Sequence, residues 1–347
     1  MQEYYLCLIR GEQRGLWPWL LRLGLWLLSI PYAIAARARN WLFDAGWKKT
    51  HEAPIPVISI GNLTVGGTGK TPCVEYVAKW FRRHDLRVVI LSRGYGVKEG
   101  PNDEALLLEE NLPDVPHLQG PDRSELATTA AEELESEVAV LDDGFQHRRL
   151  ARNLDIVLID ALAPWGYGSV LPRGLLREPL SGLQRASLIL VTRSDQVTPE
   201  EYNRILTRIQ SLAPDKPIVQ TTHSPTTLIN SDQETSPLSR LQETKVAAFC
   251  GIGNPQAFRN TLEMLDVELV DFRTFSDHHA YTREDVEDLR RWARNLAMDC
   301  VIVTTQKDLV KIRLNRIGER QLWALRIELR ITEGRDRLDR MLKEAAE

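Results

Sequence analysis

The segment Thr64–Thr71, TVGGTGKT, constrains this chain more than any other part of its sequence. It follows a short apolar stretch, Ile55–Ile60, and precedes Thr71–Arg83, where apolar residues recur at helical spacing. Glycines let several backbone N–H groups turn toward one centre, and the N-terminus of the following helix adds partial positive charge. A strand, a loop of this composition and a helix together predict a phosphate-binding loop.

Within this loop, Lys70 is placed to reach terminal phosphate oxygens, and the Thr71 hydroxyl is placed to bind Mg²⁺. The usual pattern begins with glycine, whereas this chain has Thr64 at that position. A purely structural glycine-rich turn is the alternative. The predicted nucleotide-binding residues are Thr64, Val65, Gly66, Gly67, Thr68, Gly69, Lys70 and Thr71.

The 347 residues are enough for about two domains, and the composition is that of a globular protein. The four cysteines are far apart and form no C-x-x-C or Cys/His spacing, so we expect neither a disulfide framework nor a zinc site. A reducing cytoplasm fits this pattern best. We predict no nucleic-acid partner and no obligate protein partner.

The amino end differs in charge and composition from the rest of the chain. Residues 1–50 carry seven Lys or Arg against three Asp or Glu, and they hold five of the nine tryptophans. The longest uncharged run, Leu23–Ala36, has 14 residues, whereas a spanning helix needs about 20. Pro18 and Pro31 interrupt the apolar region, and no signal-peptide cleavage pattern follows it.

An apolar stripe at helical spacing, flanked by arginines, predicts a helix that lies in a membrane interface and favours an anionic leaflet. The alternative is a buried first helix that covers the sheet. The stripe consists of Leu20, Leu23, Leu27, Ile30 and Ile34.

Beyond residue 50, apolar strands alternate with helices, which predicts a doubly wound, mostly parallel sheet of the P-loop kinase type. The stretch 220–244 is polar and lacks helical periodicity, so we place an interdomain connection there. The predicted organisation is an interfacial helix region at 1–50, a nucleotide-binding domain at 51–219, this connection, and a smaller α/β domain at 245–347.

Two acidic residues end one predicted strand. Val138–Leu141 is apolar, and Asp142 and Asp143 follow it directly, as expected where a strand end holds Mg²⁺ directly or through water. A strand cap before a turn is the alternative. Gln146 and His147 follow at the sheet edge where α/β folds bind ligands, and we predict that they contact substrate.

Separate strings of the chain together resemble the tetraacyldisaccharide 4′-kinase family, which acts in lipid A and lipopolysaccharide biosynthesis. The resemblance extends from about residue 16 to residue 330. The strings are GNLTVGGTGKTP (Gly61–Pro72), LSRGYG (Leu91–Gly96), LDDGFQHR (Leu141–Arg148), LREPL (Leu176–Leu180) and FSDHHAY (Phe275–Tyr281).

The resemblance implies transfer of phosphate from ATP to the 4′-hydroxyl of a lipid A disaccharide 1-phosphate, giving lipid IVA, on the cytoplasmic face of the bacterial inner membrane. It implies that Asp103 activates the hydroxyl with His278 as its partner, and that Asn102 replaces a family glycine. We also predict Lys70 and Asp143 as catalytic residues and Arg177 as a substrate contact.

The predicted metal ligands are Thr71, Asp142, Asp143 and Glu104. Because Asp103 and His278 lie on opposite sides of the predicted connection, we expect them on different domains, so that domain closure becomes a condition of turnover.

Two other functions fit part of the sequence. Membrane-associated P-loop ATPase switches have a lysine immediately before the double glycine, where this chain has Val65. A non-enzymatic lipid-binding or partner-binding α/β protein would require Lys70, Asp103 and the Asp142–Asp143 pair all to be incidental.

Overall fold

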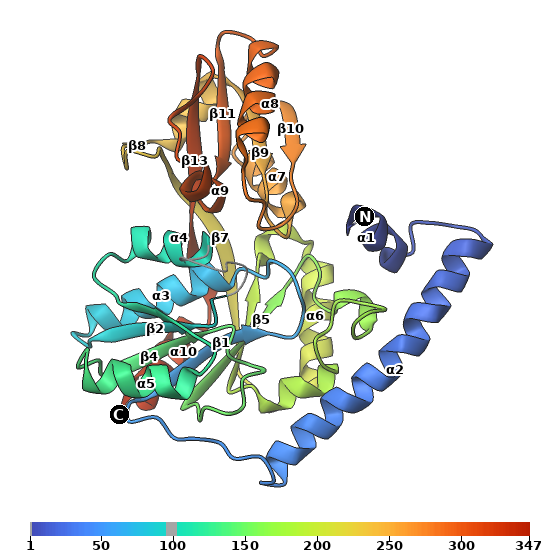
Figure 1. Ribbon diagram of the computed structural model, residues 1–347, viewed down its shortest axis with the longest axis vertical. Coiled ribbons are helices and arrows are strands. Elements are labelled where there is room, and N and C mark those ends of the chain that lie inside the picture. Colours follow the sequence, from blue (N-terminus) through green and yellow to red (C-terminus); the bar gives the residue numbers. More distant parts are fainter. Residues whose placement is uncertain (1, 95–102) are drawn as a thin grey trace. The chain divides into compact units, whose positions relative to one another are not determined.

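The computed structural model describes residues 2–94 and 103–347 (Figure 1). Tyr95 and Gly96 of the LSRGYG string lie outside these residues, as does Asn102. The chain divides into two compact units. Unit 1 consists of Met1–Gly94, Asp114–Thr222 and Ile331–Glu347, and unit 2 consists of Tyr95–Pro113 and His223–Arg330.

Unit 1 is built on a parallel sheet with the strand order β7-β6-β5-β1-β4-β2-β3. Its strands are β1 (Val57–Asn62), β2 (Val88–Ser92), β3 (His117–Gln119), β4 (Val138–Asp142), β5 (Leu154–Asp160), β6 (Leu188–Thr192) and the start of β7 (Ile218–Ile229). Its helices are α1 (Gln2–Arg10), α2 (Leu16–Asp44), α3 (Lys70–Arg83), α5 (Arg123–Glu132), α6 (Pro199–Leu212) and α10 (Arg335–Ala346), with short 3₁₀ helices at Gly166–Gly168, Leu180–Arg185 and Ser194–Gln196.

The central strands of unit 1 are apolar because both faces of the sheet are covered. Every residue of β1, β2, β4 and β5 is buried, which explains their continuous apolar runs. Ala127 and Ala130 of α5 pack with alternate residues of these strands, and α3 packs on β1, β2 and β4. The carboxyl ends of the strands therefore meet at one edge, where the phosphate-binding loop follows β1.

Gly61 allows a close approach at this edge. A Cβ atom at Gly61 would lie 2.7 Å from the backbone nitrogen of Phe145, a contact that real side chains do not tolerate. The absence of a side chain therefore lets the loop after β4, which begins with Asp143, pack against the end of β1.

Helix α2 is one uninterrupted helix from Leu16 to Asp44 (Figure 1). Pro18 lies in its first turn, where a missing N–H removes no helical bond, and Pro31 lies inside it. By length and composition it could cross a membrane, with a mean hydropathy of 1.5 over its most apolar window, of which only 6% is buried. The alternative of a buried helix covering the sheet is therefore wrong, and the prolines do not divide the helix.

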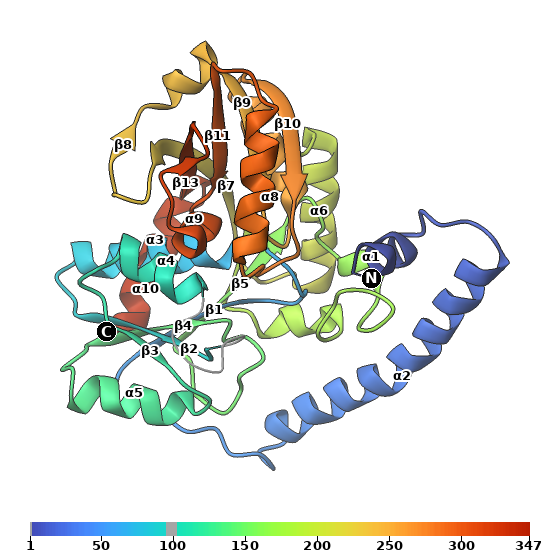
Figure 2. The same cartoon turned by 45° about the horizontal axis from the view of Figure 1, so that its top comes forward.

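Unit 2 is a smaller α/β unit with the strand order β10-β9-β11-β13-β7. Its strands are β8 (Thr235–Ser236), β9 (Lys245–Cys250), β10 (Glu268–Thr274), β11 (Cys300–Thr305), β12 (Arg316–Ile317) and most of β7 and of β13 (Arg320–Glu333). Its helices are α4 (Asp103–Asn111), α7 (Pro255–Met264), α8 (Arg283–Arg294) and α9 (Gln306–Ile312), with a 3₁₀ helix at Leu238–Glu243. Helices α8 and α9 pack on one face of the sheet (Figure 2), and α7 packs on the other.

These boundaries differ from the predicted ones at three places. The stretch 220–244 holds most of β7 and all of β8 instead of a bare connection. Helix α10 belongs to unit 1, because Leu338 and Leu342 are buried and the helix packs on β1 and β5. Helix α4 belongs to unit 2, where it packs on α9.

Candidate active site

The phosphate-binding loop has the backbone that its glycines require. Gly66 and Gly69 have φ angles of 110° and 86°, a region in which other side chains are strained. Helix α3 begins at Lys70 with Gly69 as its N-cap residue. Because glycine has no side-chain acceptor, the first-turn N–H groups remain directed toward the loop, as phosphate binding requires.

Side chains at neighbouring strand ends hold this loop in place. The contacts are Asn62 Nδ2 to Thr68 Oγ1 (2.7 Å), Thr192 Oγ1 to the Thr68 carbonyl (3.0 Å) and an Arg193 guanidinium nitrogen to the Gly67 carbonyl (3.0 Å). On the other side, the Val65 N–H donates to the Leu175 carbonyl at 2.8 Å. Sequence reasoning did not select Thr192 or Arg193, so it missed this support.

Arg193 is itself fixed by a buried ion pair. Its guanidinium lies 2.6 Å from Asp160 Oδ2 at the end of β5, and both side chains are less than 10% exposed. Its backbone is left-handed, with a φ of 55°. The ion pair with Asp160 thus fixes the guanidinium that donates to the Gly67 carbonyl of the phosphate-binding loop.

Asp143 stands between two cations. Lys70 Nζ is 3.4 Å from one carboxylate oxygen, and Arg177 is 2.7 Å from the other. Burial raises the pKa of Asp143, but the charges of Lys70 and Arg177 outweigh it and hold the pKa below its ordinary value. The structure therefore brings together three predicted site residues, with Asp143 ionised at neutral pH. We call Lys70, Asp142, Asp143, Gln146 and Arg177 the donor cluster.

The other polar residues after β4 lie at the same edge. Gln146 donates from Nε2 to the Asn62 carbonyl at 2.9 Å, and its Oε1 is 3.4 Å from Arg177. Burial, together with Arg123 and Arg152, lowers the pKa of His147 to about 4, so this imidazole is neutral at physiological pH. A neutral ring can donate a hydrogen bond to a substrate hydroxyl or accept one from it.

The donor set fits a magnesium ion. Asp142 is 5% exposed at the end of β4, and Asp143 follows it beside Lys70. Among the described residues no group of three His, Cys, Asp or Glu forms a closed metal site. Magnesium does not need one, because it retains water and binds substrate phosphates together with one or two carboxylates. Thr71, in the first turn of α3, would offer a hydroxyl as a further oxygen ligand.

Unit 2 brings Asp103 and His278 into direct contact. Nδ1 of His278 lies 2.9 Å and 3.0 Å from the two carboxylate oxygens of Asp103. The prediction that the two residues lie on different domains is wrong, because Asp103 begins α4 and α4 belongs to unit 2. Because both residues lie in unit 2, their positions give no reason to expect that domain closure is a condition of turnover.

Contact between Asp103 and His278 shifts their pKa values in opposite directions. Burial raises the pKa of Asp103, but the hydrogen bond from His278 and the charges of Lys307 and Lys311 bring it below the ordinary value. The same hydrogen bond raises the pKa of His278, against the opposing effects of burial and Lys307. Asp103 is 8% exposed, so its carboxylate is largely shielded from water.

Two lysines that sequence reasoning did not select surround Asp103. Lys307 lies 3.8 Å from Asp103 and 3.1 Å from Glu104, and Lys311 lies 3.6 Å from Asp103. Their spacing of four residues on α9 places both on one side of that helix, which is the signal that could have found them. Glu104 thus pairs with Lys307, and its role as a metal ligand stays a prediction.

Asp308 organises the segment that carries His278. It is fully buried, and it accepts hydrogen bonds from the Gly251 N–H (3.1 Å), the Tyr281 hydroxyl (3.0 Å) and the Thr305 hydroxyl (2.7 Å). These bonds connect the ends of β9 and β11 to the FSDHHAY string. They hold the segment that carries His278 against the start of α9.

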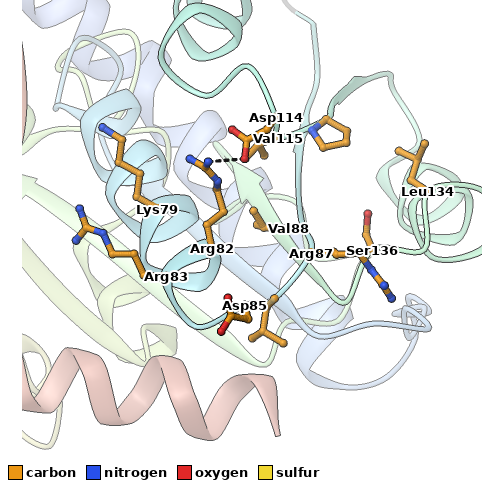
Figure 3. Close-up of a pocket in the computed structure, with 12 residues that line it drawn as sticks. Lys79, Arg82, Arg83, Asp85, Arg87, Val88, Asp114, Val115, Leu134 and Ser136 are labelled. Atoms are coloured by element: carbon orange, nitrogen blue, oxygen red, sulfur yellow. Dashed lines mark ion pairs between the residues drawn. The ribbon is translucent and has the colours of Figure 1, made fainter.

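A hollow of about 630 Å³ lies elsewhere in unit 1, near the start of β2 (Figure 3). Three of the four cations that line it form ion pairs, since Arg82 pairs with Asp114, Arg87 with Glu137 and Lys79 with Glu75. It lies at the amino ends of the strands, whereas ligands in α/β folds bind at their carboxyl ends. We therefore assign no chemistry to this hollow.

Comparison with known proteins identifies the family. A sequence model of the tetraacyldisaccharide-1-P 4′-kinase family matches residues 21–347. The chain belongs to this family. The tetraacyldisaccharide 4′-kinase of Anaeromyxobacter sp. (strain K) is 39% identical over 92% of this chain and 89% of its own length. The corresponding protein of Halothermothrix orenii is 34% identical over 90% of this chain and 88% of its own length.

A solved structure of a family member has the same fold. LpxK from Aquifex aeolicus, in complex with ATP, is 32% identical and superposes with a TM-score of 0.73 over 94% of this chain and all of its own. The predicted family and the predicted α/β fold are thereby confirmed.

Proposed function

We propose that the donor cluster and the Asp103–His278 pair are the catalytic groups of this tetraacyldisaccharide 4′-kinase. The chain is an ATP-dependent kinase of lipid A biosynthesis, as its family membership establishes. The observation that carries the residue assignment is the contact of His278 Nδ1 with both carboxylate oxygens of Asp103, a largely buried carboxylate that also lies near Lys307 and Lys311.

In the proposed reaction, Asp103 accepts the proton of the 4′-hydroxyl of tetraacyldisaccharide 1-phosphate. The electron pair left on the 4′-oxygen forms a bond to the γ-phosphorus of ATP. The bond between this phosphorus and the leaving ADP oxygen breaks, giving ADP and the 4′-phosphate. His278 orients the Asp103 carboxylate through its Nδ1 contact. Positioned acid–base groups of this kind contribute about 10²–10⁴-fold to rate.

The donor cluster neutralises charge on the phosphates. Lys70 and Arg177 are the cations, and backbone N–H groups of Thr64–Thr71 surround the phosphate chain. Thr71, Asp142 and Asp143, with Glu104 as a further candidate, would hold the magnesium ion, which neutralises phosphate oxygens when bound. Gln146 and His147, together with Arg177, contact substrate in this proposal.

The exposed apolar side chains of α2 support a location of the protein at the membrane surface. Its exposed apolar side chains include Trp17, Trp19, Leu27 and Ile34, and basic residues flank them. We infer that α2 lies on the cytoplasmic face of the inner membrane as a peripheral anchor, where a lipid acceptor is accessible.

The decisive experiment measures transfer of radiolabelled γ-phosphate from ATP to lipid A disaccharide 1-phosphate. Asp103→Asn keeps the shape of the side chain but removes the proton acceptor, so kcat falls by about 10²–10⁴-fold. Lys70→Ala removes a clamp group and lowers kcat by about 10²–10³-fold. Asp299→Asn, which removes an exposed carboxylate of unit 2, is the control and retains activity. Near-full transfer by either active-site variant would overturn the assignment.

A further inference from the structure

Glu178 is a buried acidic residue that the proposed mechanism does not use. Its side chain is 3% exposed, and it directly follows Arg177 of the donor cluster. A buried carboxylate is costly unless hydrogen-bond donors satisfy it. Its donors are Asn40 Nδ2 at 2.7 Å, Arg185 at 2.9 Å and Gln146 Nε2 at 3.0 Å.

These contacts lead directly to the phosphate-binding edge. Gln146 also contacts Arg177, which pairs with Asp143 at 2.7 Å. The Arg177 N–H donates to the Leu63 carbonyl at 2.7 Å, next to the phosphate-binding loop. Glu178 is therefore linked to the groups around Asp143 in two ways. It accepts a hydrogen bond from Gln146, and it follows Arg177 directly in the chain.

Helix α2 meets the same cluster through one of its sides. The Tyr32 hydroxyl donates to the Arg177 carbonyl at 2.9 Å, Arg39 donates to the Gln146 carbonyl, and Asn40 donates to Glu178. At about 100° per residue these three side chains share one side of the helix, whereas exposed Ile34 and Trp41 lie on the other. The helix thus presents its apolar side to solvent and its polar side to the donor cluster.

We propose that Glu178, held by Asn40 of α2, is a positioning residue that orients Gln146 and Arg177 at Asp143. This inference rests on the proposed function of the donor cluster. It gives α2 a second task besides anchoring, because the helix that carries the apolar surface also sets the geometry of the phosphate-binding groups. Loss of the Asn40–Glu178 bond lowers kcat and leaves recovery on lipid vesicles unchanged.

A double-mutant cycle tests the link. Asn40→Asp places two carboxylates at hydrogen-bond distance, and Glu178→Gln removes the charged acceptor, so each lowers kcat at least tenfold. Combining them restores a donor–acceptor pair of opposite polarity, since the new glutamine amide donates to the new aspartate. The double variant is expected to recover at least fivefold in kcat over Asn40→Asp, with the KM for ATP little changed.

Asp44→Asn is the matched control. Asp44 also links α2 to the rest of unit 1, through Arg148 at 2.6 Å, but no hydrogen bond joins it to Glu178 or Arg177, so the kcat of this variant stays within twofold of wild type. An activity-independent readout is amide hydrogen exchange of the peptide 176–180, which becomes faster in Asn40→Asp and slower again in the double variant.

The outcomes separate the two proposals. Single variants within twofold of wild-type kcat, or a double variant no better than the singles, would overturn the role of Glu178. Phosphate transfer that survives the single substitution Lys70→Ala would instead contradict the donor-cluster assignment. The exchange measurement would still report on the Asn40–Glu178 link.

Discussion

At the scale of single residues, both halves of the proposed site depend on unusual backbone conformations. Asp143 and His278 have φ angles of 52° and 55°, in the left-handed region that residues other than glycine seldom adopt. Such conformations persist where surrounding contacts determine them, and they gather at functional sites. Here Lys70 and Arg177 hold Asp143, and Asp103 holds His278.

The Asp103–His278 contact predicts a measurable titration. We expect the pKa of His278 to lie above its ordinary value of 6.5, because the hydrogen bond to Asp103 favours the charged ring. Protonated His278 therefore stabilises the fold below pH 6.5, and this contribution is lost as the pH rises through the higher folded pKa. Histidine ring NMR, with the signal assigned through His278→Gln, measures it.

Asp103→Asn provides the control for this titration, because it removes the charge while keeping the size of the side chain. In that variant the pKa of His278 should fall. A pKa that is the same in both proteins would show that the contact does not form in solution.

The buried Arg193–Asp160 pair predicts a large loss of stability. Arg193→Ala leaves Asp160 as an uncompensated buried charge, so the free energy of unfolding should fall by about 3–5 kcal/mol. Urea denaturation measures the change. Arg82→Ala, which breaks the more exposed pair with Asp114 in the same unit, should cost less than about 1 kcal/mol. Equal losses in the two variants would contradict the bracing role.

At the scale of elements, α2 combines two surfaces that a globular core helix does not have. Its first half exposes tryptophans and leucines, which a helix in water cannot leave uncovered without cost. Its second half bonds to the rest of unit 1 through Tyr32, Arg39 and Asn40. These bonds favour a helix that lies along a membrane surface over one that crosses the bilayer.

The apolar side of α2 predicts binding to anionic vesicles. Leu27→Glu combined with Ile34→Glu places charges on this side, so recovery on phosphatidylglycerol vesicles should fall at least tenfold. Sedimentation of protein with vesicles is the measurement. Met298→Glu changes a still more exposed apolar residue, in unit 2, and should leave recovery unchanged. Undiminished binding by the double variant would refute the interfacial role of α2.

At the scale of the whole molecule, the two units divide the chemistry between them. The phosphate-binding loop and its cations belong to unit 1, and the proposed base with its histidine belongs to unit 2. This division cuts across the order of the sequence, because α4 is inserted between β2 and β3 of unit 1 yet packs on α9.

The division predicts where ATP acts. Magnesium and ATP should slow amide hydrogen exchange in peptides covering Gly61–Thr71 and 142–147, because bound phosphate orders the loop and the first turn of α3. Peptides from the core of unit 2, such as β9 and β11, should change little. In Lys70→Ala the protection should be lost at the same ATP concentration. Protection centred on unit 2 would contradict the assignment of ATP to the donor cluster.

Local patterns were sufficient for much of this protein. The phosphate-binding loop, the apolar strands and the acids at the end of β4 are all properties of contiguous residues, since glycine conformations and strand burial leave direct traces in the sequence. The same holds for the apolar side of α2. The motifs that resemble the tetraacyldisaccharide 4′-kinases were also contiguous, and the comparisons confirm that family.

Tertiary structure alone decided which distant residues meet. Lys307 contacts Asp103, Arg193 supports Gly67, and Glu178 joins α2 to the donor cluster, although nothing in their local sequence requires it. Such contacts depend on how strands and helices pack, because a buried charge selects its partner by proximity after folding rather than by spacing along the chain. The sequence by itself therefore determined the phosphate chemistry and the family. Only the packing of α4 and α9 placed Asp103 with His278 and its lysines in one unit.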